Sequence, residues 1–147
     1  TEAGVLVGVS TADCVPIFVV DPKKRAVAAL HAGWRGAASG VLERGLEVMQ
    51  ESVGSDPARI HLHLGPAICG DCYEVGSEVF EALEQPVPAN PAPIDLRAVL
   101  AQRAVDAGVA QDQITVSEHC TRCGESGLFS HRGGDRERQV GYIGIRA

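Results

Sequence analysis

Short apolar runs and amphipathic stretches alternate along this chain. Two runs of strand length, residues 15–20 and 26–30, are rich in branched side chains and flank the turn signal Asp21-Pro22. This pattern predicts two neighbouring strands joined by a hairpin turn. If the strands pair antiparallel, the start of the first lies beside the end of the second, which places Cys14 next to His31.

Further strands and helices follow from the same kind of pattern. Branched or alternating apolar residues predict strands over residues 4–9, 60–64, 114–116 and 140–145. Apolar residues at three- and four-residue spacing predict helices over residues 41–53, 74–84 and 96–107, the last with Asp95 as its N-cap. Residues 33–36 are expected to form a glycine-bracketed turn and residues 85–93 an irregular, proline-rich loop. Strands and helices together predict the mixed α/β or α+β class.

Length and charge exclude several classes of protein. The chain has 147 residues, enough for one domain with its own core. No apolar run approaches the roughly 18 residues of a membrane-spanning helix, so we expect no membrane partner. The net charge of -6 argues against a nucleic-acid partner held through its phosphates.

The cysteine count and the first residues predict location and domain limits. An odd number of cysteines, with no signal-peptide pattern at the start, predicts a cytoplasmic protein. The chain opens directly in a strand pattern and without a Met. We therefore expect that the domain lacks its N-terminal segment.

Cys14 and His31 are the first candidates for chemistry. A thiol and an imidazole within reach of each other can form a nucleophile–base pair or half of a metal site. Taken one at a time, Cys14 would be a small buried hydrophobe and His31 a structural histidine at a strand end.

The other cysteines form two CxxC pairs, Cys69 with Cys72 and Cys120 with Cys123. Two such pairs are typical of a structural zinc site, but the 47 residues between Cys72 and Cys120 exceed the spacing of a zinc ribbon. Both pairs lie in predicted loops, so folding could join them into one structural metal site. The alternative is that they are core thiols with incidental neighbours.

Four blocks occur in order along the chain, and together they resemble the signature blocks of a known family. They are Ala12-Asp13-Cys14-Val15-Pro16; His31-Ala32-Gly33-Trp34-Arg35-Gly36; Gly65-Pro66-Ala67-Ile68 with Tyr73-Glu74-Val75-Gly76; and Cys120-Thr121 with Phe129-Ser130-His131-Arg132. The family is YfiH, also called laccase-domain, "multicopper polyphenol oxidase" or peptidoglycan editing factor.

This resemblance implies a fold and an activity. The implied fold is α+β, a layered sandwich of mixed β-sheet with flanking helices, related to toxin-type cysteine hydrolases. Residues 1–147 would form a single catalytic domain that lacks its N-terminal segment. The implied activity is a zinc-dependent purine nucleoside phosphorylase acting on adenosine, inosine and S-methyl-5′-thioadenosine, with adenosine deaminase activity. The alternatives are a Cys–His hydrolase, such as an amidase editing peptidoglycan precursors, and a polyphenol oxidase, as the family's name suggests.

The resemblance also implies a set of site residues. Cys14 and His31 match two zinc ligands of the family, and the third, a histidine N-terminal to the first block, is absent from this sequence. Cys14, His31 and Arg132 are the implied catalytic residues, and Arg35, Ser130 and His131 are the candidates for binding substrate. The expected partners are a purine nucleoside and phosphate, because a guanidinium fork matches two phosphate oxygens at once. The sequence carries no signal for the oligomeric state.

Copper is the less favoured metal. A blue-copper site uses two histidines, a cysteine and a weak axial ligand, and a multicopper enzyme needs further copper sites. Five histidines and one methionine are too few to build all of these.

Overall fold

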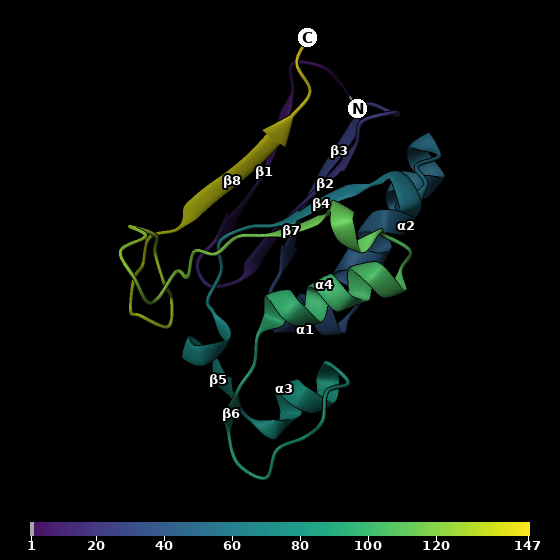
Figure 1. Ribbon diagram of the computed structural model, residues 1–147. Coiled ribbons are helices and arrows are strands. Elements are labelled where there is room, and N and C mark those ends of the chain that lie inside the picture. The colour runs from purple at the N-terminus through teal and green to yellow at the C-terminus, as the bar shows by residue number, and fades with distance from the viewer. Residues whose placement is uncertain (1) are drawn as a thin grey trace.

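A mixed four-stranded sheet forms the centre of the molecule in the computed structural model, which describes residues 2–147 (Figure 1). Its strand order is β3-β2-β4-β7. Strand β2 (Val15–Asp21) runs antiparallel to β3 (Ala26–Ala32) and to β4 (His61–Leu64). Strand β4 runs parallel to β7 (Ile114–Val116). The predicted hairpin is therefore confirmed.

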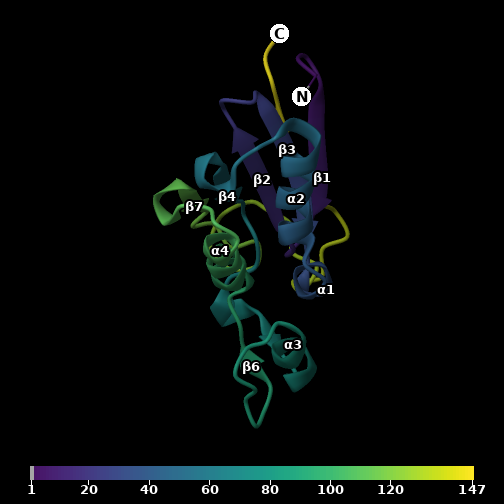
Figure 2. The same ribbon diagram turned by 90° about the vertical axis from the view of Figure 1, so that its right-hand side faces the viewer.

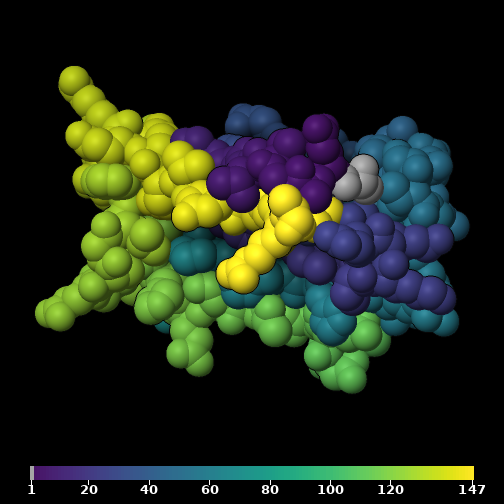
Figure 3. Space-filling model, turned by 90° about the horizontal axis from the view of Figure 1, so that it is seen from above, coloured from purple at the N-terminus to yellow at the C-terminus, as the bar shows by residue number. Residues whose placement is uncertain are grey.

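A second, two-stranded sheet lies against one face of this central sheet. Strand β1 (Leu6–Thr11) pairs antiparallel with β8 (Gln139–Gly144) and contacts β3 and β2. Phe18 of β2 points toward β8, and a Cβ at Gly141 would lie 2.5 Å from its ring. The lack of a side chain at Gly141 therefore allows β8 to pack closely against Phe18 of the central sheet. Because β1 and β8 pair, the first and last segments of the chain lie side by side (Figure 3).

Helices cover the opposite face of the central sheet. The main contact is made by α2 (Val41–Val53), which buries Leu42, Leu46 and Met49 along one side. Leu30 of β3 faces α2, because a Cβ at Gly45 would lie 2.5 Å from its Cδ1. Leu30 pairs with Ile17, whereas Phe18 points to the other face, as alternation along a strand requires. The helices α1 (Trp34–Ala38) and α4 (Leu96–Asp106) lie on the same side as α2 (Figure 2).

The predicted α+β class is confirmed, and so are several single elements. Asp95 caps α4, accepting backbone N–H groups of Arg97 and Ala98 at 2.9 and 3.3 Å. Strand β4 alternates between exposed histidines and buried leucines, as its sequence predicts. The described residues also contain three single-turn 3-10 helices: η1 (Pro57–Arg59), η2 (Gly70–Cys72) and η3 (Gln111–Gln113). No helix of the described chain is long and apolar enough to cross a membrane.

Three local predictions were wrong. The helix expected over residues 74–84 is shorter, since Glu74–Val75 forms strand β5 and Gly76 is the N-cap of α3 (Ser77–Ala82). Strand β5 pairs with β6 (Ala92–Pro93), so the proline-rich loop ends in a strand. The glycine-bracketed turn over residues 33–36 is the first turn of α1, which Gly33 begins in an extended conformation.

The hairpin turn between β2 and β3 depends on a buried carboxylate. Asp21 is 1% exposed and accepts the backbone N–H of Lys24 at 2.9 Å. Burial opposes ionisation, but hydrogen bonding outweighs it and holds the pKa of Asp21 below its usual 3.8. A carboxylate with a lowered pKa stabilises the folded state above the unfolded pKa, and this contribution is lost as pH falls through the folded pKa.

We therefore expect Asp21→Asn to lower the free energy of unfolding at pH 7 by about 1–3 kcal/mol. The difference from the wild type should shrink as pH falls through the lowered pKa of Asp21, because the wild-type carboxyl then becomes protonated as well. Urea unfolding at pH 7 and at a series of lower pH values measures both the difference and its decline. Asp112→Asn, which changes an exposed carboxylate, is the control and should leave both values unchanged. A difference that persists undiminished at low pH would contradict this account.

Candidate active site

The β2–β3 hairpin places Cys14 and His31 on one face of the sheet. Pro16 pairs with His31, and directly paired residues share a face. Cys14 lies two residues before Pro16 and therefore points to that face too. A Cβ at Gly33, two residues beyond His31, would lie only 2.9 Å from Cys14 Sγ. The half-buried thiol is thus packed against Gly33, diagonal to the exposed His31 ring.

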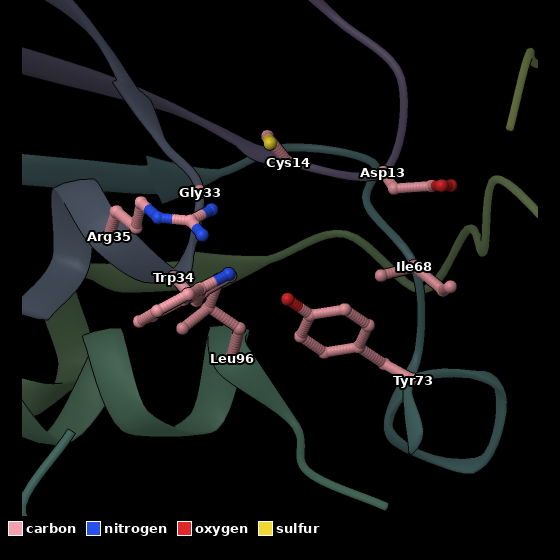
Figure 4. A pocket seen from close by; sticks show the side chains of 8 residues that line it. All are labelled: Asp13, Cys14, Gly33, Trp34, Arg35, Ile68, Tyr73 and Leu96. Carbon is pink, nitrogen blue, oxygen red and sulfur yellow. The ribbon is translucent and has the colours of Figure 1, made fainter. Parts of the chain in front are cut away.

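Cys14 also borders a pocket at the end of the hairpin (Figure 4). The Tyr73 hydroxyl and the Trp34 indole edge point toward each other across this pocket, and the Asp13 carboxylate points away from it. The lining is mainly aromatic and aliphatic, with Cys14 at one edge. The lining residues are Asp13, Cys14, Gly33, Trp34, Arg35, Ile68, Tyr73 and Leu96.

The surroundings of Cys14 raise the pKa of its thiol. Burial raises the pKa of Cys14, the neighbouring negative charge of Asp13 raises it further, and the positive charge of Arg138 offsets part of the effect. Reactive cysteines have lowered pKa values, because the thiolate is the nucleophile. Cys14 is therefore not activated as a free nucleophile by the residues around it.

The carboxylate of Asp13 joins three loops beneath this pocket. Asp13 is 7% exposed, and its carboxylate accepts hydrogen bonds from the Thr121 hydroxyl at 2.6 Å and from the backbone N–H of Arg132 at 2.7 Å. The backbone carbonyl of Asp13 accepts the N–H of Ile68 at 3.1 Å. Asp13 has a φ of 80°, a left-handed conformation that short polar residues tolerate better than most. Thr121 was not a predicted site residue, although it directly follows Cys120 in a motif block.

The two predicted arginines lie over aromatic rings beside the pocket. The Arg35 guanidinium lies 4.2 Å from the Trp34 ring centroid, and that of Arg132 lies 5.0 Å from the Tyr73 centroid. Arg132 also donates through Nη1 to the carbonyl of Glu74 at 2.8 Å. Both arginines border a second, more polar cavity that shares Trp34 and Tyr73 with the first. Two cations are thus held at the edge of the Cys14 pocket.

Ser130 and His131 occupy the turn that leads to Arg132. Ser130 is 2% exposed, and its hydroxyl accepts the backbone N–H of Gly133 at 2.9 Å. Its own N–H is bound by Asp135 at 2.8 Å. His131 is exposed, and its side chain makes no hydrogen bond among the described residues. The Ser130 hydrogen bonds therefore stabilise this turn, whereas the His131 side chain lies at the surface.

The two CxxC pairs come together in one cluster. The Sγ atoms of Cys69, Cys72, Cys120 and Cys123 all lie within 4.8 Å of one another. Three backbone N–H groups, those of Cys69, Arg122 and Cys123, donate to Cys120 Sγ at 3.2, 3.3 and 3.4 Å. Burial opposes ionisation of Cys120, but these donors outweigh it and lower its pKa to about 6. The four cysteines are thus positioned to bind a metal ion.

Cys14 and His31 lack a third ligand in the described chain. Over residues 2–147 the four cysteines are the one group of three or more potential metal ligands. Catalytic zinc is held by three protein ligands, of which a cysteine and a histidine on one face can supply two. These two residues therefore fit part of a zinc site. A further ligand would have to come from outside the described residues.

Sequence comparison identifies the family. The profile of the family described as multi-copper polyphenol oxidoreductase laccase matches residues 1–146. The chain belongs to this laccase-domain family. The crystal structure of YlmD from Geobacillus stearothermophilus covers 99% of the chain with a TM-score of 0.92 at 37% sequence identity. A Bacillus licheniformis protein described as hypothetical protein YfiH gives the same TM-score at 32% identity.

Named relatives in the laccase-domain family are enzymes of purine nucleosides. Adenosine deaminase RL5, from an unidentified prokaryote, is 43% identical over 140 residues, which cover 88% of this chain and 53% of RL5. Purine nucleoside phosphorylase YlmD of G. stearothermophilus is 37% identical over 99% of this chain and 58% of its own length. The chain therefore spans little more than half the length of these relatives.

The contact between Gly33 and Cys14 generates a test by a double-mutant cycle. A Cβ at position 33 would displace the thiol, so we expect Gly33→Ala to lower the free energy of unfolding by about 1–3 kcal/mol. In a Cys14→Ala background the crowding partner is gone, and the cost should fall to well under half. Urea unfolding of the four proteins measures the coupling. Equal costs in both backgrounds would contradict the contact.

The Asp13 network generates a second test. Thr121→Val keeps the side-chain shape but removes one donor from a buried carboxylate, so we expect a loss of about 1–3 kcal/mol in the free energy of unfolding. Thr121→Ser keeps the hydroxyl and serves as the matched control, with a loss of less than about half as much. If both variants unfold alike, the hydroxyl is not what holds this loop.

Proposed function

We propose that this chain carries catalytic residues of a zinc-dependent purine nucleoside phosphorylase that acts on adenosine, inosine and S-methyl-5′-thioadenosine and also deaminates adenosine. The likeness to a purine nucleoside phosphorylase and an adenosine deaminase, over 88–99% of the chain, carries this proposal. The activity is assigned to the whole protein, because the chain spans little more than half the length of those relatives.

In this proposal Cys14 and His31 hold the catalytic zinc together with a histidine from outside the described residues. Their common face and the contact of Cys14 with the pocket support this assignment. When bound there, zinc supplies Lewis acidity and a source of hydroxide near neutral pH. Asp13 positions the loop that bears Cys14, since its carboxylate holds that loop to Thr121 and Arg132.

The adjoining cavities suit a nucleoside and an anion. The rings of Trp34 and Tyr73 form walls on which a flat purine base can pack. Arg35 and Arg132 border the more polar cavity and offer guanidinium forks to phosphate, whereas Glu78 adds an opposing charge there. Phosphorolysis forms a bond between a phosphate oxygen and ribose C1′ and breaks the C1′–N9 bond, and the departing base takes up a proton. Arginines that hold phosphate beside C1′ would align this displacement.

We propose that Ser130 and His131 contribute to substrate binding through the same turn. Ser130 supports the backbone that leads into Arg132, because its hydroxyl fixes Gly133. His131 is exposed next to Arg132 and is free to reach a bound ligand.

The potential metal ligands of this chain support copper chemistry less well than zinc chemistry. A multicopper oxidase needs several histidine-rich sites. Within residues 2–147 no group of three or more potential metal ligands contains a histidine. A metal-free Cys–His hydrolase related to toxin-type enzymes, acting on peptidoglycan precursors, would need an activated thiol, which the surroundings of Cys14 do not provide.

The test is turnover of adenosine by the full protein with and without phosphate. Adenine with ribose 1-phosphate indicates phosphorolysis, and inosine indicates deamination. We expect both, and we expect Cys14→Ser and His31→Ala each to lower kcat/KM by about 100-fold or more, because each removes a metal ligand. Arg132→Gln should raise the KM for phosphate by about tenfold to a hundredfold, through loss of a charged hydrogen bond. Arg136→Gln, an exposed arginine of the same loop, is the matched control.

Chelation separates the candidate functions. Loss of both activities on removal of metal, with recovery on addition of Zn²⁺ in the wild type but not in Cys14→Ser, supports the proposal. Activity toward a peptidoglycan amide that survives chelation would replace it with the hydrolase. Copper-dependent oxidation of a phenol, without nucleoside turnover, would replace it with the oxidase.

A further inference from the structure

The folding of the sheet explains why two distant CxxC pairs meet. Strands β4 and β7 are parallel neighbours, so the loops that leave their carboxyl ends start side by side. The pairing continues past the strands through a bridge between Ala67 and Cys120, and Thr121 donates its N–H to the carbonyl of Ala67 at 3.1 Å. Each loop then delivers one CxxC pair. The cluster is therefore built by the sheet.

The spacing of the sulfur atoms fits a tetrahedral ion. Zinc–sulfur bonds of about 2.3 Å at tetrahedral angles separate two sulfurs by about 3.8 Å. Cys69 Sγ and Cys123 Sγ, one from each pair, lie 3.7 Å apart. A disulfide would require about 2.0 Å. All four cysteines are free, and four thiolates form a closed site of the kind that zinc occupies for structural purposes.

Backbone hydrogen bonds favour a metal thiolate at Cys120. Three N–H groups converge on its sulfur, from Cys69 in one loop and from Arg122 and Cys123 in the other. Groups around metal ligands commonly orient the ligand and offset its charge in this way. The Arg122 side chain adds a contact between the loops, since its Nη1 donates to the carbonyl of Cys72 at 3.0 Å.

The cluster is joined directly to the pocket wall. Cys69 follows Ile68 and Cys72 precedes Tyr73, and both neighbours line the Cys14 pocket. Cys120 precedes Thr121, whose hydroxyl holds the Asp13 carboxylate. Any ion that fixes the four sulfurs therefore also fixes the segments that shape this pocket.

We propose that Cys69, Cys72, Cys120 and Cys123 bind one Zn²⁺ as a structural site that fastens the loop after β4 to the loop after β7 and so holds the pocket wall in place. The ion is separate from the one assigned to Cys14 and His31. Each S–H that becomes a Zn–S bond releases its proton to solvent. No electron is transferred, because zinc is not redox active.

Metal content of the full chain tests the proposal without any measurement of turnover. Purified under reducing conditions with Zn²⁺ and then dialysed, the Cys14→Ala variant should retain about one zinc per chain. Cys123→Ser, which changes the exposed cysteine of the cluster, should weaken zinc binding by about 100-fold or more in the same background. Replacement by Co²⁺ in the Cys14→Ala chain should give the absorption spectrum of a tetrahedral tetrathiolate, which keeps the test independent of how Cys123→Ser folds.

The positioning role has its own readout in hydrogen exchange. Removal of zinc by a chelator should speed backbone exchange in residues 67–73 and 117–123 by about tenfold or more, while helix α2 keeps its protection. Zinc retained by Cys123→Ser at full affinity, two disulfides in place of metal, or a Co²⁺ spectrum without four thiolates would each overturn the proposal. Unchanged exchange on zinc removal would overturn the positioning role. Failure of the nucleoside assays would leave the zinc result as it stands.

Discussion

The buried carboxylate of Asp13 is the contact on which the rest of this site depends. One oxygen accepts a hydroxyl from the loop after β7, and the other accepts a backbone N–H from the segment that leads into β8. The backbone carbonyl of the same residue binds the loop after β4. A buried charge is stable only when its oxygens are satisfied. Three loops are therefore held at the residue directly before Cys14, and the edge of the pocket is fixed from several sides at once.

The parallel pairing of β4 with β7 has an equally wide effect. Antiparallel strands can be linked by a tight turn, whereas parallel strands need a crossover, here the stretch that contains α3 and α4. That crossover brings Tyr73 and Leu96 to the pocket and sends both CxxC loops out from one edge of the sheet. The parallel pairing of β4 with β7 thus determines both the apolar pocket and the thiol cluster, whose residues are close neighbours in the sequence.

Local patterns in the sequence predict local structure well in this chain. The β2–β3 hairpin, the amphipathic α2 and the Asp95 cap of α4 follow from apolar spacing and capping chemistry, which act over a few residues. The short helix α1 was missed because the glycines at 33 and 36 favour a turn, and the β5–β6 pair was missed because it joins two-residue segments from either side of α3. For the site, the pairing that brings the start of β2 beside the end of β3 was predictable from a hairpin. The joining of the CxxC pairs was one of two alternatives that the sequence left open, since a decision required knowledge of which strands are parallel neighbours. The role of Thr121 was missed for the same reason.

The two groups of side chains proposed to bind metal differ in the length of chain between their members. Cys14 and His31 are 17 residues apart, whereas Cys69 and Cys123 are 54 apart. Closing the longer loop costs about 1 kcal/mol more in chain entropy, and it also requires a parallel pairing that forms slowly. A newly made chain can offer an ion only separate CxxC half-sites until β7 has reached β4. The topology therefore implies an order of assembly, in which the local β2–β3 hairpin forms early and the thiol cluster is completed only when β7 pairs with β4.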